Sequence, residues 1–129
     1  MPRTVEDLVA EARSRIREIS LEDLVDMLAG DLVLVDVREP DEYAQGHLPG
    51  AVNLPRGVLE FQIHAHPAMA CVADAALAEP SRRMVLYCRT GGRSALAADS
   101  LRQLGFTDVC SLAGGFEAWR NADLPVSME

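Results

Sequence analysis

Short apolar runs alternate with amphipathic stretches along the whole chain, and this alternation predicts its architecture. Near-continuous apolar runs are typical of parallel strands that are buried on both faces of a sheet. Four such runs occur, at Leu32–Val37, Ala51–Leu54, Met84–Tyr87 and Val109–Leu112. Strands that alternate with helices favour an α/β fold with a central, mostly parallel sheet and helices on both faces.

Capping residues set the limits of the first two helices. Thr4 can cap a helix that we predict to continue to about Glu18, because apolar residues follow at helical spacing. Ser20 precedes an acidic residue at capping-box spacing and predicts a second helix, which ends near Gly30. The apolar positions of the first helix are Val5, Leu8, Val9, Ala12 and Ile16.

Glycine and proline divide the rest of the chain into short elements. Pro40 suits the first turn of a helix, and Gly46 ends that helix. Pro80 closes a longer apolar segment that precedes the third strand. The helices predicted after Gly30 are Asp41–Gln45, Leu59–Ile63, Ala70–Ala78, a segment from Ser94 to Gly105 and a short segment from Gly114.

Length and composition limit the class of protein. The 129 residues fit one domain, which we place at residues 20–127, preceded by an N-terminal helical extension at residues 1–19. The formal net charge of −8 disfavours nonspecific nucleic-acid binding, because that binding depends on neutralising phosphates. All 12 basic residues are arginines, which excludes Schiff-base chemistry on lysine.

Targeting signals and cysteines indicate the compartment. The N-terminal residues lack the apolar core of a secretory signal, and no apolar run approaches the length of a membrane span. The three cysteines have no paired spacing that would indicate a disulfide framework. We therefore expect a cytoplasmic protein with no membrane and no nucleic acid among its partners.

One apolar run ends in a reactive environment. Cys88 follows Met84–Tyr87 and opens a short loop with two glycines and two arginines, after which a helix is predicted. Backbone N–H groups of such a loop and the helix N-terminus both stabilise an anion, so we expect Cys88 to be largely thiolate near neutral pH. Ligands also collect at the carboxyl ends of parallel strands. Cys88 is the candidate nucleophile, and the candidate substrate-binding residues are Arg89, Thr90, Gly91, Gly92 and Arg93.

Four other interpretations of this loop are open. A cysteine phosphatase needs one more residue between its cysteine and arginine than the four that separate Cys88 from Arg93, and it also needs a general acid. Cys88 could instead be a buried small hydrophobe or a redox-sensing thiol that forms a sulfenic acid. A binding or regulatory module without turnover could keep the same loop.

Three segments together resemble a known family. Asp36–Tyr43 followed by Gly46–Leu54 resembles the first signature of the single-domain rhodanese family of sulfurtransferases. Cys88–Arg93 resembles its active-site loop, and Leu112–Trp119 resembles its closing signature. The resemblance covers roughly residues 20–125, and the combination in this order is far more specific than any one segment.

The resemblance implies a fold and a chemistry. A rhodanese-like domain would take the outer sulfur of a small anionic donor such as thiosulfate onto Cys88 as a persulfide. It would then pass that sulfur to cyanide or to a thiol acceptor, with thioredoxin, glutathione or a sulfur-relay protein as partner. Backbone amides from Arg89 to Arg93 would surround the persulfide. No metal and no organic cofactor is required, and a good leaving group such as sulfite needs no protonation.

The charged residues near the loop have two alternative roles. Arg89 and Arg93 either attract the anionic donor or brace the loop through ion pairs with acids such as Asp36 or Glu39. We expect Arg93 to brace the loop or to bind close to the sulfur, and Arg89 to face the entrance. Asp36 and Arg38 are interpreted as structural residues that tie adjacent loops together.

The remaining candidates have simpler interpretations. His64, His66 and Cys71 fall short of a structural zinc set, so we expect a solvated loop or a pocket wall there. Cys71 and Cys110 lie among apolar residues and are interpreted as small hydrophobes. His47 is expected in a turn, and the segment Arg56–Phe61 could line the pocket. Phe116 and Trp119 are expected to anchor the last helix in the core.

Overall fold

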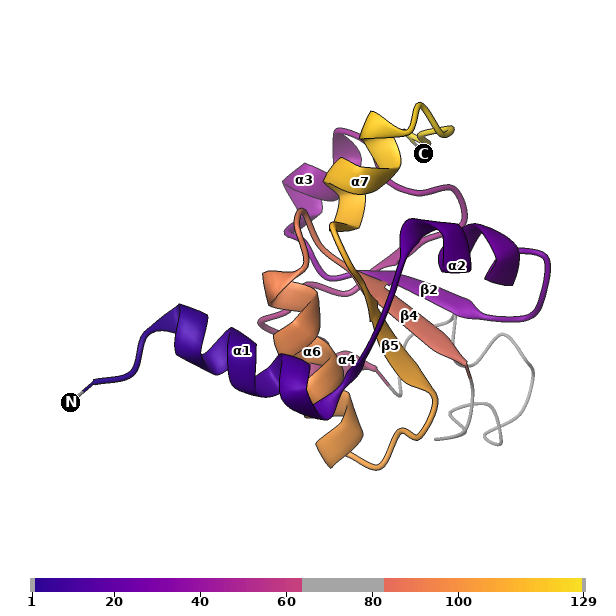
Figure 1. Cartoon of the computed structure of the whole chain (residues 1–129). Helices are drawn as coiled ribbons and strands as arrows, with labels where there is room; N and C mark the ends of the chain where they lie inside the picture. The colour runs from indigo at the N-terminus through magenta and orange to yellow at the C-terminus, as the bar shows by residue number, and fades with distance from the viewer. Residues whose placement is uncertain (1, 64–82, 129) are drawn as a thin grey trace.

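A computed structural model describes residues 2–63 and 83–128 and shows a five-stranded sheet. The strand order is β1-β5-β4-β2-β3, and neighbouring strands of this sheet run parallel. Figure 1 shows the sheet in the middle of the molecule with helices on both sides. The predicted α/β architecture is therefore confirmed. The strands are β1 (Arg17–Ile19), β2 (Val33–Asp36), β3 (Val52–Asn53), β4 (Met84–Tyr87) and β5 (Val109–Leu112).

The helices agree closely with the predicted segments. Thr4 caps the first helix, and its side chain and that of Asp7 form a reciprocal capping box. Pro40 begins α3 as predicted, and the predicted helix Ala70–Ala78 lies outside the described residues. The described helices are α1 (Val5–Arg15), α2 (Leu21–Met27), α3 (Pro40–Ala44), α4 (Leu59–Gln62), α6 (Gly92–Gln103) and α7 (Gly115–Asn121). None of the described helices is long and apolar enough to cross a membrane.

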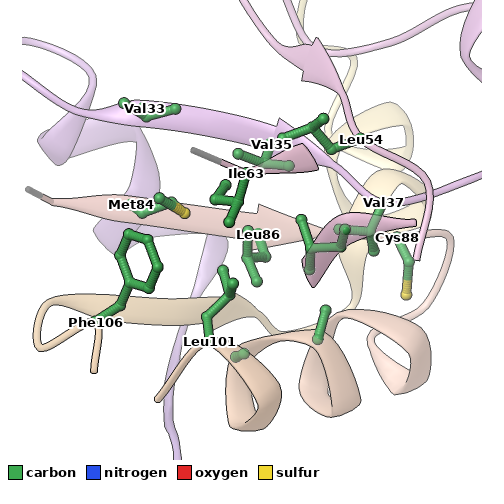
Figure 2. Packing of buried hydrophobic residues seen from close by; sticks show 13 residues of the cluster. Val33, Val35, Val37, Leu54, Ile63, Met84, Leu86, Cys88, Leu101 and Phe106 are labelled. Carbon is green, nitrogen blue, oxygen red and sulfur yellow. The ribbon is translucent and has the colours of Figure 1, made fainter. Parts of the chain in front are cut away.

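Alternate residues of the strands fill two separate cores. Val33 and Leu86 point to the face that α4 and α6 cover, and Figure 2 shows this cluster reaching as far as Cys88. Leu34 and Val85 point to the other face, where they pack with residues of α2 and α7. Both faces are apolar, which explains why the strand sequences show no polar alternation.

The first helix ends earlier than predicted. It stops at Arg15, and Arg17–Ile19 forms the edge strand β1, which pairs with β5. Ile19 is buried, whereas Arg17 and Glu18 are exposed. A three-residue edge strand with one buried side chain has no apolar run, so the sequence pattern could not separate it from the end of the helix.

The helix α1 packs on its own domain, beside α6 (Figure 1). Ala12 is buried in the contact. Arg15 donates from Nε to Asp99 Oδ1 at 3.0 Å and from Nη2 to Oδ2 at 2.7 Å. The hydrogen bond from Arg15 lowers the pKa of the Asp99 carboxyl. The helix is therefore held by an apolar contact and by a two-point ion pair.

Candidate active site

The strand β4 delivers Cys88 into a group of hydrogen-bond donors. The side chain is buried, and its Sγ accepts from the Gly91 N–H at 3.1 Å and from the Ser94 N–H at 3.4 Å. The Ser94 hydroxyl lies 3.6 Å from the same sulfur. Donors that converge on one sulfur stabilise negative charge on it. The arrangement can hold an anionic thiolate or a persulfide.

Gly91 allows the tight turn of this loop. It has a φ of +117°, which only glycine adopts without strain, and it is the N-cap of α6. The helix α6 begins at Gly92, two residues before the predicted start at Ser94. Ser94 therefore lies in the first turn, where backbone N–H groups have no partner within the helix. The sulfur of Cys88 supplies that partner.

Two buried serines, Ser94 and Ser111, support the loop through hydrogen bonds. The Ser94 Oγ lies 3.2 Å from the Gly91 carbonyl oxygen, to which it can donate, and 2.8 Å from the Ser111 Oγ. Both side chains are fully buried. Neither serine was predicted as a site residue. The available signal was Ser111, which places a hydroxyl in the middle of an otherwise apolar strand. A buried polar group needs a hydrogen-bond partner, so this hydroxyl indicated a second polar group nearby.

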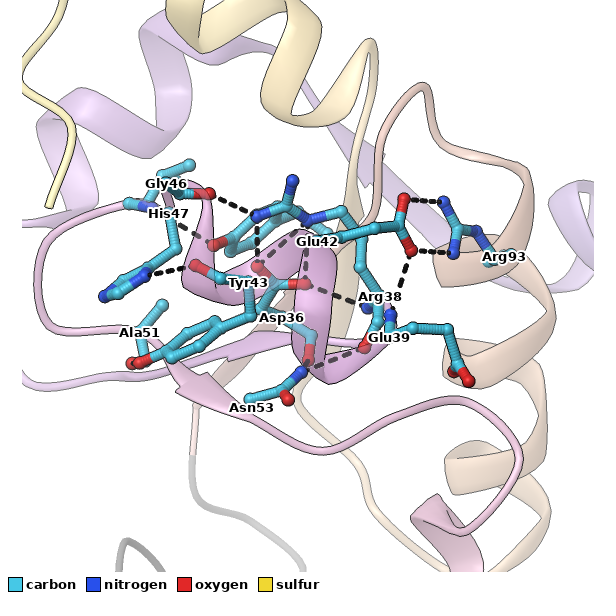
Figure 3. A network of polar contacts seen from close by, with 12 residues as sticks. Asp36, Arg38, Glu39, Glu42, Tyr43, Gly46, His47, Ala51, Asn53 and Arg93 are labelled. Atoms are coloured by element: carbon cyan, nitrogen blue, oxygen red, sulfur yellow. Dashed lines mark hydrogen bonds and ion pairs between the residues drawn. The ribbon is translucent and has the colours of Figure 1, made fainter. Parts of the chain in front are cut away.

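The two loop arginines are held by acids that the sequence did not suggest. Arg93 donates from Nη1 and Nη2 to the two Glu42 oxygens at 2.7 and 3.1 Å, as Figure 3 shows. This contact lowers the pKa of Glu42 to about 2. Arg89 donates from Nε to Glu117 at 3.2 Å and is the more exposed of the two arginines. Asp36, one of the acids proposed from the sequence, is occupied by Arg38 instead.

Asp36 and Arg38 form the structural tie that the sequence predicted. Their side chains are buried, and the Arg38 Nη2 donates to Asp36 Oδ2 and to the Gly46 carbonyl, each at 2.7 Å (Figure 3). The Arg38 guanidinium also lies 4.4 Å from the centre of the Phe116 ring. Asn53 donates to the carbonyls of both Asp36 and Arg38. These contacts connect β2, β3 and the segment after α3.

The last helix approaches the back of the loop very closely. The Phe116 N–H donates to the Cys88 carbonyl at 2.8 Å, and the Glu117 N–H donates to the Arg89 carbonyl at 3.0 Å. A Cβ atom at Gly115 would lie 2.4 Å from the Cys88 carbonyl oxygen. Glycine at this position is therefore needed for the contact, which fixes two peptide groups of the loop.

A pocket of about 440 Å³ opens over the loop, and α1 forms one of its walls. The opposite wall consists of Cys88, the residues that follow it and Leu96 of α6. The segment Arg56–Phe61 does not contribute, although the sequence suggested that it could. The sequence signal for α1 was its apolar stripe, which predicts a helix but not what the helix lies against. The lining residues of α1 are Val5, Glu6, Val9, Ala10 and Arg13.

A sequence model of the Rhodanese-like domain family matches residues 20–122. The chain belongs to this family. The match contains β2, the Cys88 loop and α7 and leaves α1 outside. The resemblance noted in the three sequence segments is therefore confirmed over most of the chain.

Relatives of this rhodanese-like chain are named as sulfurtransferases. A protein of Allochromatium vinosum named "Sulfurtransferase" is 36% identical over 113 residues, which cover 86% of this chain and 94% of that protein. The thiosulfate:glutathione sulfurtransferase of Homo sapiens is 35% identical over 105 residues, which cover 78% of this chain and 90% of that protein. These similarities support sulfur transfer as the general activity.

A solved structure resembles the rhodanese-like chain over nearly its whole length. It is RPA3614 of Rhodopseudomonas palustris, described as a protein of unknown function and a possible tyrosine phosphatase. Its TM-score is 0.82 at 33% identity, and the alignment covers 98% of this chain and 96% of that one. The shared fold thus extends beyond the residues that the family model matches.

The other residues singled out in the sequence of this rhodanese-like chain lie in its interior or outside the described residues. Cys110 is a buried free thiol whose pKa is raised by burial, as expected of a small hydrophobe. His47 is buried and stacks on the Tyr43 ring at 3.7 Å between centroids. Phe116 and Trp119 are buried in the core, which confirms their predicted anchoring role. His64, His66 and Cys71 lie outside the described residues.

Proposed function

We propose that this protein transfers sulfane sulfur through a persulfide on Cys88. The observation that carries the proposal is the position of the Cys88 sulfur at the end of β4, where the N–H groups of Gly91 and Ser94 point at it. Thiosulfate or another small anion would be the donor, and cyanide or a thiol such as glutathione would be the acceptor.

The first half-reaction loads the cysteine. The Cys88 thiolate attacks the outer sulfur of thiosulfate, the S–S bond breaks, and sulfite leaves with the electron pair. Sulfite is stable as an anion, so the step needs no general acid. The N–H groups that hold the thiolate would then hold the anionic outer sulfur of the persulfide. Thr90 and the two glycines contribute backbone to this cradle.

The second half-reaction unloads the cysteine. An acceptor thiolate or cyanide attacks the outer sulfur, and the Cys88 thiolate is restored as the leaving group. Arg89, the more exposed arginine, would attract the anionic reactants at the entrance. Arg93 would add positive charge to the loop while Glu42 keeps its guanidinium in place.

A cysteine phosphatase is the second candidate, and the description of RPA3614 is what favours it. The arginine of a phosphatase loop must be available to bind the phosphoryl oxygens. In this protein both outer nitrogens of Arg93 donate to Glu42. The loop N–H groups also close on the sulfur, which disfavours phosphate in the same place.

The proposal is tested by following one sulfur atom. The protein is incubated with thiosulfate, its intact mass is measured for one added sulfur, and thiocyanate is measured after cyanide is added. We expect both signals from the wild type and from the matched control Cys110→Ala, and neither from Cys88→Ser. A non-catalytic module would give no signal at all. Retention of both signals in Cys88→Ser would also overturn the proposal.

A parallel assay addresses the phosphatase candidate. Wild type and Cys88→Ser are incubated with an aryl phosphate, with and without vanadate. We expect no hydrolysis that depends on Cys88. Vanadate-sensitive hydrolysis without sulfur loading would instead identify the loop as a phosphate site.

A further inference from the structure

The helix α1 is a fixed wall of the Cys88 pocket, although it lies outside the residues that the family model matches. The ion pair between Arg15 and Asp99 and the burial of Ala12 hold it against α6. Its contribution to the pocket therefore comes from outside the part of the chain that the family model matches.

Two side chains of α1 lie directly against the glycines of the loop. The Val9 Cγ2 lies 3.8 Å from the position that a Cβ atom would take at Gly92. The Arg13 Nη2 lies 3.4 Å from the equivalent position at Gly91. Gly91 is the residue whose N–H donates to the Cys88 sulfur at 3.1 Å. An apolar surface and a cation thus both adjoin the sulfur site.

The pocket is larger than inorganic donors require. Pockets of about 300–1,000 Å³ typically hold organic ligands, and this pocket measures about 440 Å³. Val5 and Val9 of α1 and Leu96 of α6 give it an apolar part. Arg89 and Arg93 also contribute to the lining but are paired with Glu117 and Glu42. Arg13 is paired with Glu18 through Nε, and its Nη2 is the nitrogen that lies near Gly91. The lining suits a molecule with an apolar body and an anionic sulfur.

We propose that α1 makes this enzyme selective for organic sulfane-sulfur donors, in which an apolar group carries a terminal anionic sulfur. The inference rests on the proposed sulfurtransferase function and names its substrate class. The terminal sulfur lies at Cys88, the apolar body lies against Val5 and Val9, and the Arg13 guanidinium faces the anionic group. Thiosulfate fits the same cradle but has no apolar body to contact α1.

An aryl thiosulfonate is a donor of this class that can load Cys88. The Cys88 thiolate attacks the terminal sulfur, the S–S bond breaks, and the aryl sulfinate leaves with the electron pair. The transferred sulfur stays on Cys88 as a persulfide. No external oxidant, reductant or proton is needed, because the sulfane sulfur keeps its oxidation state.

The test compares two donors on helix variants. Loading of Cys88 is measured as kcat/KM with benzenethiosulfonate and with thiosulfate, using cyanide as the common acceptor. The variants are Val9→Ser and Val5→Ser, which remove apolar surface from the pocket. Leu8→Ser is the matched control, because Leu8 is an exposed residue of α1 that does not line the pocket. Val5 is also exposed, so its replacement cannot simply unfold the protein.

We expect the wild type to prefer the organic donor. Val9→Ser should reduce that preference by about tenfold, the size of effect that a few lost methyl contacts produce, and Leu8→Ser should leave it unchanged. Arg13→Gln should slow loading from both anionic donors to a similar extent.

Two other outcomes separate the proposals. Loading from thiosulfate with no preference for the organic donor, or an equal effect of Val9→Ser and Leu8→Ser, would overturn the inference and leave the proposed function in place. Absence of loading from either donor would overturn the proposed function and the inference with it.

Discussion

The Cys88 sulfur occupies a position that a serine or aspartate oxygen usually takes at the start of a helix. It accepts the Ser94 N–H in the first turn of α6, and Gly91 stands at the N-cap without a side chain of its own. The same hydrogen bonds thus begin a helix and hold a reactive sulfur. A change of residue at either position acts on both functions together.

Gly115 should tolerate no side chain. Gly115→Ala places a Cβ atom 2.4 Å from the Cys88 carbonyl oxygen, so α7 must move away from the loop. We expect the free energy of unfolding to fall by about 3 kcal/mol and sulfur loading of Cys88 to be largely lost. Urea unfolding and the mass assay measure the two effects.

Gly50→Ala is the matched control for this change. Gly50 also has a positive φ, of +82°, but no atom lies within 4 Å of a Cβ atom there. Gly50→Ala should lower the free energy of unfolding only by the backbone strain of about 1–2 kcal/mol, and it should leave sulfur loading of Cys88 intact. Equal effects of the two substitutions would show that crowding at Gly115 is unimportant.

The ion pair between Glu42 and Arg93 should make stability depend on pH. The pKa of Glu42 is lowered from 4.5 to about 2 in the folded protein, chiefly by its hydrogen bond to Arg93. The stabilisation is therefore present above pH 4.5 and is lost as the pH falls towards 2. Because the pair is partly exposed, we expect it to contribute only about 1 kcal/mol to the free energy of unfolding.

Glu42→Gln measures this contribution. The free energy of unfolding of the wild type should approach that of Glu42→Gln as the pH falls through this range. Asp41→Asn, an exposed position on the same helix, should keep the wild-type pH profile. A constant difference between wild type and Glu42→Gln at every pH would contradict the expectation.

At the scale of the elements, α1 and β1 show what a sequence pattern can and cannot reveal. The cap at Thr4 and the apolar stripe predicted the presence and the start of α1 correctly, because both are local signals. The strand β1 was missed because its place in the sheet comes from pairing with β5, a distant segment. The side of the domain on which α1 packs also depends on distant residues such as Asp99.

Asp99→Asn should loosen α1 without unfolding the sheet. The substitution removes the charge that Arg15 binds at two points. We expect backbone amides of α1 to exchange with deuterium about tenfold faster, while amides of β2 and β4 keep their protection. Exchange mass spectrometry with peptide resolution measures both. Unchanged exchange in α1 would mean that its apolar contact alone is sufficient.

At the scale of the whole molecule, the sequence predicted the architecture better than the site. Four apolar runs predicted β2 to β5, and parallel order follows from the helices between them. The nucleophile candidate could be located because a strand, a glycine loop and a helix start are adjacent in sequence. The acids that pair with Arg89 and Arg93 could not be predicted from the sequence. Glu117 and Glu42 belong to separate elements that only the fold brings to the loop.

The hydrogen bonds from α7 to the carbonyls of Cys88 and Arg89 have a consequence for synthesis of the chain. Residues 115–121 are made after the loop, and their N–H groups complete its geometry. A nascent chain that ends before α7 therefore carries the thiol without the support behind it. The loop is therefore completed only once α7 has been made, later than all five strands of the sheet that bears the thiol.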